Sequence, residues 1–234
     1  MHTNLNLAAP IALLALLAVC GLIFVSAIAL VFSILQRRFV VARAALVAIA
    51  ATGVMYIGLV MFFSLRSNDR LLERGEEKYF CEMDCHLAYS ITDVREQKTL
   101  EDKFNSADST NRVAANGSFW LVTIQTRFDE KTTSPARGDA PLRPNSRDVY
   151  VEDKHGKRYS PSSEAQHMLV RLDHSGTPMS TPLRPGESYT TTFVFDLPID
   201  VSDPALLIQE TNPITRLVIG HENSFFHKKI RFQL

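Results

Sequence analysis

The chain has 234 residues, and its 25 Lys and Arg residues balance its 25 Asp and Glu residues, so the formal net charge is zero. A nucleic-acid-binding protein would show a basic patch with aromatic residues among it, and the sequence has none, so nucleic acid is not an expected partner. A phosphate-binding glycine loop and the Gly-x-Ser-x-Gly elbow of serine hydrolases are also absent, and no enzymatic activity is predicted.

Two apolar segments open the chain, at about residues 7–35 and 44–65. Each is long enough to cross a bilayer, which takes about 20 apolar residues. Arg37 and Arg38 lie between them and Arg43 begins the second, whereas no Lys, Arg, Asp or Glu precedes the first. Positive residues in short loops stay in the cytoplasm. Residues 1–65 therefore predict a transmembrane helical hairpin in a bacterial inner membrane, with both termini on the extracytoplasmic, periplasmic side.

A cleaved signal peptide is the alternative for the first segment, but it needs a basic start, a shorter apolar core and a small-residue cleavage site. None is clear, and the apolar run continues past Cys20, which is interpreted as a membrane-helix residue. Residues 66–78 are charged and contain helix formers, which predicts a linker or short helix. The basic residues of that segment, Arg66, Arg70, Arg74 and Lys78, are the one feature that opposes the predicted orientation.

Strand signals dominate residues 79–234. Trp120, Val122 and Ile124 alternate with polar residues, as Tyr189, Phe193 and Phe195 do, which is typical of half-buried strands. The predicted strands are Leu87–Val94, Ser118–Phe128, Arg147–Glu152, Lys157–Ser160, Glu187–Leu197, Arg216–Gly220 and Lys229–Leu234. Leu206–Ile208 is expected to form a short strand or a turn, and a short turn is expected within Ser162–Leu172. Short strands separated by turn signals predict an all-β immunoglobulin-like sandwich.

Several segments of this domain resemble a known family. They are Ala88–Val94, Asn116–Ile124, Val151–Pro161, Leu183–Ser188 and Thr192–Pro198. The chain from about Leu87 to Leu234 is similar to extracytoplasmic bacterial immunoglobulin-like domains of unknown function, which are related to secreted mycobacterial immunoprotective antigens. The resemblance implies a fold and an extracytoplasmic location, and it implies no catalytic residues.

Cys81, Cys85 and His86 lie outside that resemblance, at the junction between anchor and domain. A Cys81–Cys85 disulfide suits an oxidising compartment. Residues four apart in an extended strand have Cα atoms about 13 Å apart, whereas a disulfide needs about 4.4–6.8 Å, so a bridge requires a tight turn between Phe80 and His86.

A metal site is the second interpretation, because two thiolates and an imidazole suit copper or zinc. His221 and His227 could supply further ligands, since the loop before the last strand and the start of the first strand lie at one end of an immunoglobulin-like sandwich. Covalent haem attachment, whose usual signal is Cys-x-x-Cys-His, and two free thiols are the remaining alternatives.

The sequence thus predicts a non-enzymatic, membrane-anchored accessory protein that binds a partner or helps assemble a membrane complex. Its expected partners are the lipid bilayer and other membrane proteins. The alternative is a redox or metal-handling protein that uses the segment from Cys81 to His86.

Overall fold

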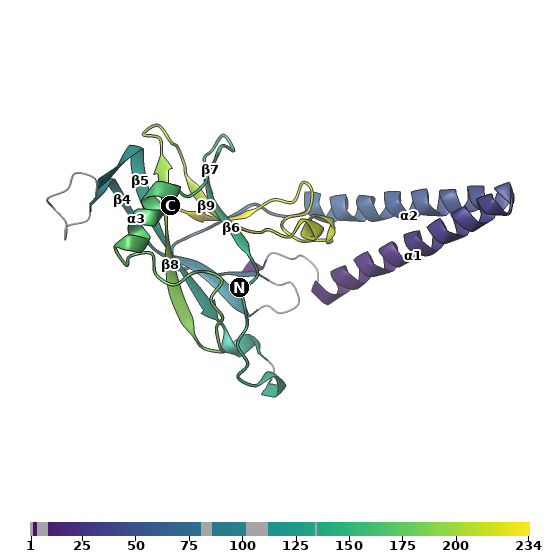
Figure 1. Cartoon of the computed structure of the whole chain (residues 1–234), viewed down its shortest axis with the longest axis horizontal. Coiled ribbons are helices and arrows are strands. Elements are labelled where there is room, and N and C mark those ends of the chain that lie inside the picture. Colours follow the sequence, from purple (N-terminus) through teal and green to yellow (C-terminus); the bar gives the residue numbers. More distant parts are fainter. Residues whose placement is uncertain (1, 4–8, 81–85, 102–111, 134) are drawn as a thin grey trace. The chain divides into compact units, whose positions relative to one another are not determined.

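A computed structural model of the chain describes residues 2–3, 9–80, 86–101, 112–133 and 135–234 (Figure 1). The chain divides into two compact units. The β-rich unit contains Met1–Thr3, Asp69–Thr211 and Lys229–Leu234, and the helical unit contains Asn4–Asn68 and Asn212–Lys228. The predicted division at residues 66–78 placed the whole of 79–234 in one domain, whereas the segment Asn212–Lys228 groups with the helices.

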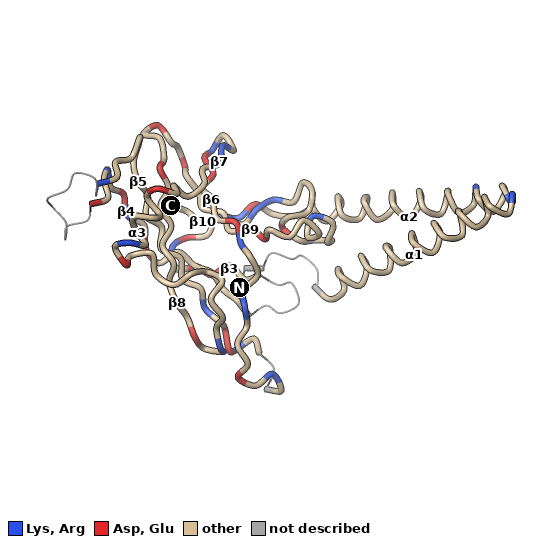
Figure 2. Tube along the Cα trace, in the orientation of Figure 1, with Lys and Arg blue, Asp and Glu red and all other residues tan. Residues whose placement is uncertain are grey.

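The helical unit is built on two long apolar helices, α1 (Ala9–Leu35) and α2 (Phe39–Leu65). Both are long and apolar enough to cross a membrane, as predicted. Each has 27 residues, or about 40 Å at 1.5 Å per residue, against about 30 Å for the hydrocarbon layer of a bilayer. Their only charged residue is Arg43, so the basic residues cluster at the turn between the helices (Figure 2).

The segment Asn212–Lys228 forms a compact cap that begins with the 3-10 helix η5 (Pro213–Leu217). Here the predicted strand Arg216–Gly220 is wrong. The side chain of Asn212 accepts a hydrogen bond from the backbone N–H of Ile214, and Pro213 occupies the first helical position, so this sequence starts a helical turn.

The β-rich unit contains two five-stranded sheets within the described residues. The first sheet has the order β1 (His2–Thr3), β3 (Lys78–Phe80), β4 (Leu87–Glu101), β5 (Arg112–Phe128), β8 (Ser188–Leu197). The second has the order β2 (Arg70–Leu72), β10 (Ile230–Gln233), β9 (Ala205–Glu210), β6 (Arg147–Glu152), β7 (Arg158–Tyr159). Short helical turns complete the unit: η3 (Glu130–Thr132), η4 (Pro135–Arg137) and α3 (Ser163–Arg171).

One buried cluster takes side chains from both sheets, which places the main core of this unit between them. Val122 and Ile124 of β5 and Phe195 of β8 belong to it, together with Leu206 and Phe232 from the second sheet. The predicted alternation of β5 and β8 is therefore confirmed. The opposite face of β5 is covered as well, because Phe119 packs in a second cluster with residues of α3.

The segment after α2 differs from its prediction as a linker or short helix. Arg70–Leu72 forms strand β2, which pairs in parallel with β10, and Leu72 is fully buried in the main core. Lys78 opens strand β3. The charged residues that suggested a linker or short helix instead flank one buried leucine, Leu72. Pairing with strand β10 decides the conformation of this segment.

A buried cation links the two sheets. Lys78 is fully buried, and its Nζ donates to the carbonyl oxygens of Ile208 at 3.0 Å and Ile230 at 3.1 Å. Arg147 of the second sheet lies over the ring of Phe80, 4.2 Å from its centroid, and forms an ion pair with Glu210. A buried charge is tolerated when such partners replace water.

Candidate functional site: the flanks of the cysteine segment

Strands β3 and β4 hold the two ends of the cysteine segment. They are antiparallel neighbours, and Phe80 is paired directly with Leu87. Paired Cα atoms in such a ladder are about 4.5–5.5 Å apart, so the two ends of the intervening segment lie side by side. Cys81 and Cys85 themselves lie outside the described residues. A Cys81–Cys85 disulfide therefore stays a prediction.

His86 is a buried and firmly oriented side chain at one of these ends. Its Nδ1 lies 2.5 Å from Thr132 Oγ1, and that hydroxyl donates to the backbone oxygen of Asp129 at 2.7 Å. The hydroxyl proton is therefore used, so Thr132 Oγ1 accepts the hydrogen bond from Nδ1–H of His86. The ring also stacks on Phe128 with centroids 5.4 Å apart. Metal-binding histidines are commonly oriented by a hydrogen bond from their other ring nitrogen.

A network of charged side chains lies beside His86 along β3 and β5. Arg127 binds Glu77 in a bidentate manner, with Nε 2.7 Å from Oε1 and Nη2 2.8 Å from Oε2. The Tyr79 hydroxyl lies 2.7 Å from Asp129 Oδ2 and accepts from Arg127 at 3.0 Å. The backbone N–H of Asp129 donates to the carbonyl of His86 at 2.8 Å, so the network fixes the start of β4.

The network fixes the protonation states of its members. The hydrogen bond from Arg127 lowers the pKa of Glu77. Burial raises the pKa of Asp129, but hydrogen bonds from Tyr79 and Arg127 outweigh it, and the net pKa is lowered. Burial, then the hydrogen bonds to Asp129 and Glu77, raise the pKa of Tyr79. At neutral pH both carboxyls are ionised and the phenol is protonated, which is the arrangement of a structural ion-pair network.

The two distant histidines belong to the helical unit. His221 is buried, and its Nδ1 accepts from the backbone N–H of Asn223 at 3.0 Å. His227 Nδ1 lies 2.6 Å from the backbone oxygen of Lys228. His86 lies in the β-rich unit, so a site shared by these three histidines stays a prediction. Among the described residues, no group of three or more His, Cys, Asp and Glu side chains could hold a metal ion.

The β-rich unit also carries two open surface pockets. One, of about 230 Å³, is lined by Asp93, Arg95 and His174 among others. The other, of about 310 Å³, is lined by Asn116 and Asp196, among others. The residues that line these two pockets do not include His86, His221 or His227.

Sequence reasoning missed the network around Arg127. Arg127 and Glu77 are 50 residues apart, and no spacing rule joins them. Asp129 was the one available clue, because aspartate is a common N-cap residue. Its side chain caps η3 by accepting a hydrogen bond from the backbone N–H of Lys131, directly after the end of β5.

Comparisons with known proteins assign the chain to no family. No family model and no curated protein matches it. Similar solved structures include the secreted protein MPT63 from Mycobacterium tuberculosis, at 8% identity and TM-score 0.40, covering 71% of this chain and 98% of that one. The yjhA protein from Bacillus subtilis is 11% identical at TM-score 0.39, covering 70% and 100%. A conserved hypothetical protein from Bacillus anthracis is 13% identical at TM-score 0.37, covering 53% and 82%.

Replacing Arg127 by Met should weaken the fold near neutral pH and have a smaller effect in acid. Loss of charged hydrogen bonds should lower the free energy of unfolding by about 2 kcal/mol. The Glu77 and Asp129 carboxyls have pKa values below their ordinary 4.5 and 3.8 in the folded chain. Their contribution is therefore present above those ordinary values and is lost as the pH falls through the folded ones. Urea unfolding of both chains near pH 7 and near pH 3 measures this.

The matched control is Arg95→Met. Arg95 pairs with Asp93 at 2.6 Å, but the two side chains are 77% and 41% exposed, so its loss should have little effect at either pH. An Arg127→Met effect that persists undiminished in acid would contradict the role assigned to the network.

Proposed function

We propose that this chain is a non-enzymatic accessory protein of a bacterial inner membrane. Its helical hairpin spans the bilayer and holds an immunoglobulin-like β-sandwich on the extracytoplasmic side. There the domain binds a partner or helps to assemble a membrane complex.

The observation that carries the proposal is how the chain enters and leaves the hairpin. His2 pairs with Lys78 and Thr3 with Tyr79 in the first sheet. Helices α1 and α2 lie between these two strands in sequence, so the segments before and after the hairpin belong to one folded unit. That arrangement supports a hairpin whose two ends lie on the same side of the membrane.

The charge pattern supports the orientation. Arg37 and Arg38 occupy the turn and Arg43 lies in the first turns of α2 (Figure 2). Short basic loops stay in the cytoplasm, which puts the open end of the hairpin and the β-rich unit outside.

The strand order supports the immunoglobulin-like interpretation. In that fold the first, second, fourth and fifth strands share one sheet, whereas the third, sixth and seventh form the other. Taking β4 as the first strand, β4, β5 and β8 are neighbours in one sheet, and β6, β9 and β10 are neighbours in the other. The fourth strand here, β7, departs from this order because it pairs with β6 in the second sheet. Side chains of both sheets also meet in one core.

The outer surface of the hairpin supports a membrane partner. Large apolar side chains are more than half exposed on both helices, among them Phe24 and Phe32 on α1 and Val54 and Met55 on α2. Lipid covers part of this surface. A single span would suffice for tethering, so a pair of helices offers further surface for packing against other membrane helices.

The orientation is tested by cysteine labelling in spheroplasts. With the native cysteines changed to Ser, Lys154→Cys in the exposed turn between β6 and β7 should react with a membrane-impermeant maleimide. Arg38→Cys in the helical turn should react only after permeabilisation. The chain without an introduced cysteine is the control, and the reverse labelling pattern would invert the proposed topology.

Partner binding is tested by purification in mild detergent from cells with native expression levels. The full chain should bring down at least one other membrane protein. A variant with Phe24 and Phe32 changed to Leu stays apolar enough to span the bilayer but alters the packing surface, and it should recover less of that protein. Recovery of this chain alone would count heavily against an accessory role.

The alternative function is copper or zinc handling by Cys81, Cys85 and His86. It is favoured by the hydrogen bond between His86 Nδ1 and Thr132, since metal-binding histidines are commonly oriented by such a bond. The full chain, purified without reductant, should be analysed for metal content and for free thiols after denaturation with chelator. No metal and one free thiol would mean a Cys81–Cys85 disulfide, because Cys20 is the third cysteine.

The opposite result is stoichiometric copper or zinc with all three thiols reduced. Loss of that metal on His86→Ala, with retention in the exposed-site control His155→Ala, would establish a metal site and replace the accessory role. A further loss on His221→Ala or His227→Ala would show that the histidines of the two units share the site.

A further inference from the structure

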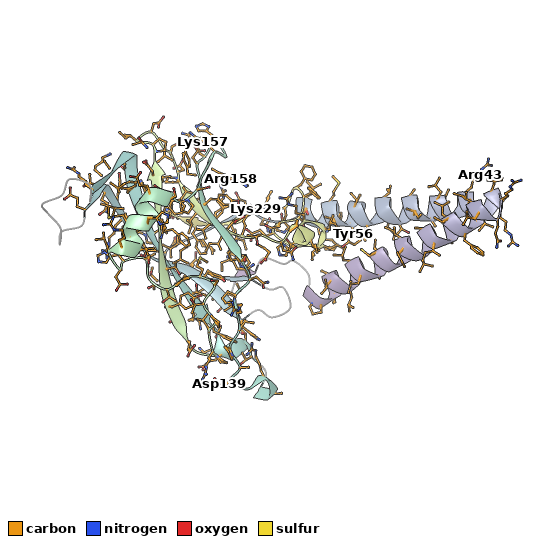
Figure 3. The ribbon with its side chains drawn as sticks, in the orientation of Figure 1. Arg43, Tyr56, Asp139, Lys157, Arg158 and Lys229 are labelled. Carbon is orange, nitrogen blue, oxygen red and sulfur yellow. The ribbon has the colours of Figure 1, made fainter. Side chains whose placement is uncertain are left out.

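The cap formed by Asn212–Lys228 packs directly on the open end of the helical hairpin. Ile219 is buried in a cluster with Leu16 of α1 and with Tyr56 and Val60 of α2. The hydroxyl of Tyr56, labelled in Figure 3, donates to the backbone oxygen of Leu217 at 2.8 Å. Non-helical backbone therefore lies against apolar helices that are long enough to span a membrane.

The contact between Tyr56 and the cap lies well before the end of α2. Tyr56 precedes the end of α2 at Leu65 by nine residues, or about 13 Å. If Arg43 marks the inner limit of the hydrocarbon layer, about 30 Å of helix, or 20 residues, brings the outer limit to about Phe63. Tyr56 is then about 10 Å inside that limit, so part of the cap reaches the depth of the acyl chains.

Backbone at such a depth must have its polar groups satisfied. The cap meets much of this requirement internally. The N–H groups of Val218 and His221 donate to the oxygens of Thr215 and Val218, and Ser224 N–H donates to the oxygen of His221. The Ser224 hydroxyl donates to the oxygen of Val218 at 2.5 Å. The backbone oxygen of Leu217 accepts a hydrogen bond from the Tyr56 hydroxyl.

The surface of the cap is apolar and carries positive charge. Its exposed apolar side chains are Ile214, Leu217, Phe225 and Phe226, which are 56%, 45%, 52% and 69% exposed. Phe226 has a φ of +63°, an unusual conformation for a bulky residue. The exposed charged residues of the cap and the adjoining end of α2 are all cationic: Arg66, Arg216 and Lys228.

We propose that this cap lies in the outer leaflet of the bilayer that holds the hairpin, with Ile214, Leu217, Phe225 and Phe226 at the boundary between headgroups and acyl chains. The three cations lie beside the lipid phosphates. Interfacial segments of this kind bury apolar side chains about 5–10 Å deep, and aromatic residues favour this level. The proposal rests on the proposed function, since it requires α1 and α2 to span the membrane.

The test uses tryptophan fluorescence of the full chain in phospholipid vesicles. The chain has one tryptophan, Trp120, so a Trp120→Phe background allows a single reporter. Phe225→Trp in that background should be quenched most by lipids brominated near the headgroup end of the acyl chains, and little by aqueous iodide. Phe226→Trp is an independent second reporter with the same expected result.

The matched control is Phe24→Trp, in the middle of α1 and 67% exposed. It should be quenched most by lipids brominated near the methyl end of the chains. Lipid quenching of Phe24→Trp, with iodide quenching at position 225 and position 226, would overturn the interfacial cap and leave the membrane anchor intact. Resistance of both cap reporters to lipid and to iodide would overturn it as well, because protein then covers the surface. Iodide quenching of all three reporters would overturn both proposals.

Discussion

The β-rich unit depends most on the hydrogen bonds that the buried side chain of Lys78 makes between its two sheets. A cation without water is costly unless other groups take its hydrogen bonds. Lys78 finds them across the core, in backbone oxygens of Ile208 and Ile230, which belong to the sheet opposite its own. The short strand β3 is thereby joined to β9 and β10, and the next residue, Tyr79, begins the network that positions His86 and the end of the cysteine segment.

The same region receives the two ends of the hairpin. Strand β1 precedes the helices and pairs with β3, and β2 follows them and pairs with β10. The hairpin is thus inserted into the β-rich unit rather than appended to it. The chain then leaves this unit again at Thr211 to form the cap and returns at Lys229. A fragment that keeps all of the strands after the hairpin therefore has to begin no later than Arg70.

Some features of the candidate site could be predicted from the sequence, and others could not. Cys81, Cys85 and His86 were evident in sequence because their residue types and spacing suggest disulfide or metal chemistry. Their surroundings were not. The contacts of Glu77 with Arg127, of Tyr79 with Asp129 and of His86 with Thr132 span about 50 residues each, and they follow from the pairing of β3, β4 and β5. No local pattern reports which residues of separate strands become neighbours.

The sequence by itself determined the elements whose signal is local. The two apolar helices follow from length and hydrophobicity, and β5, β6 and β8 follow from alternation and turn residues, because burial of one side of a strand imposes a period of two. Only the tertiary structure decided the fate of Arg70–Leu72 and Asn212–Lys228. The first became a strand because β10 offers a partner, and the second became a cap because Leu16 of α1 and Tyr56 and Val60 of α2 bind it. In both cases contacts between residues far apart in the chain outweighed weak local preferences.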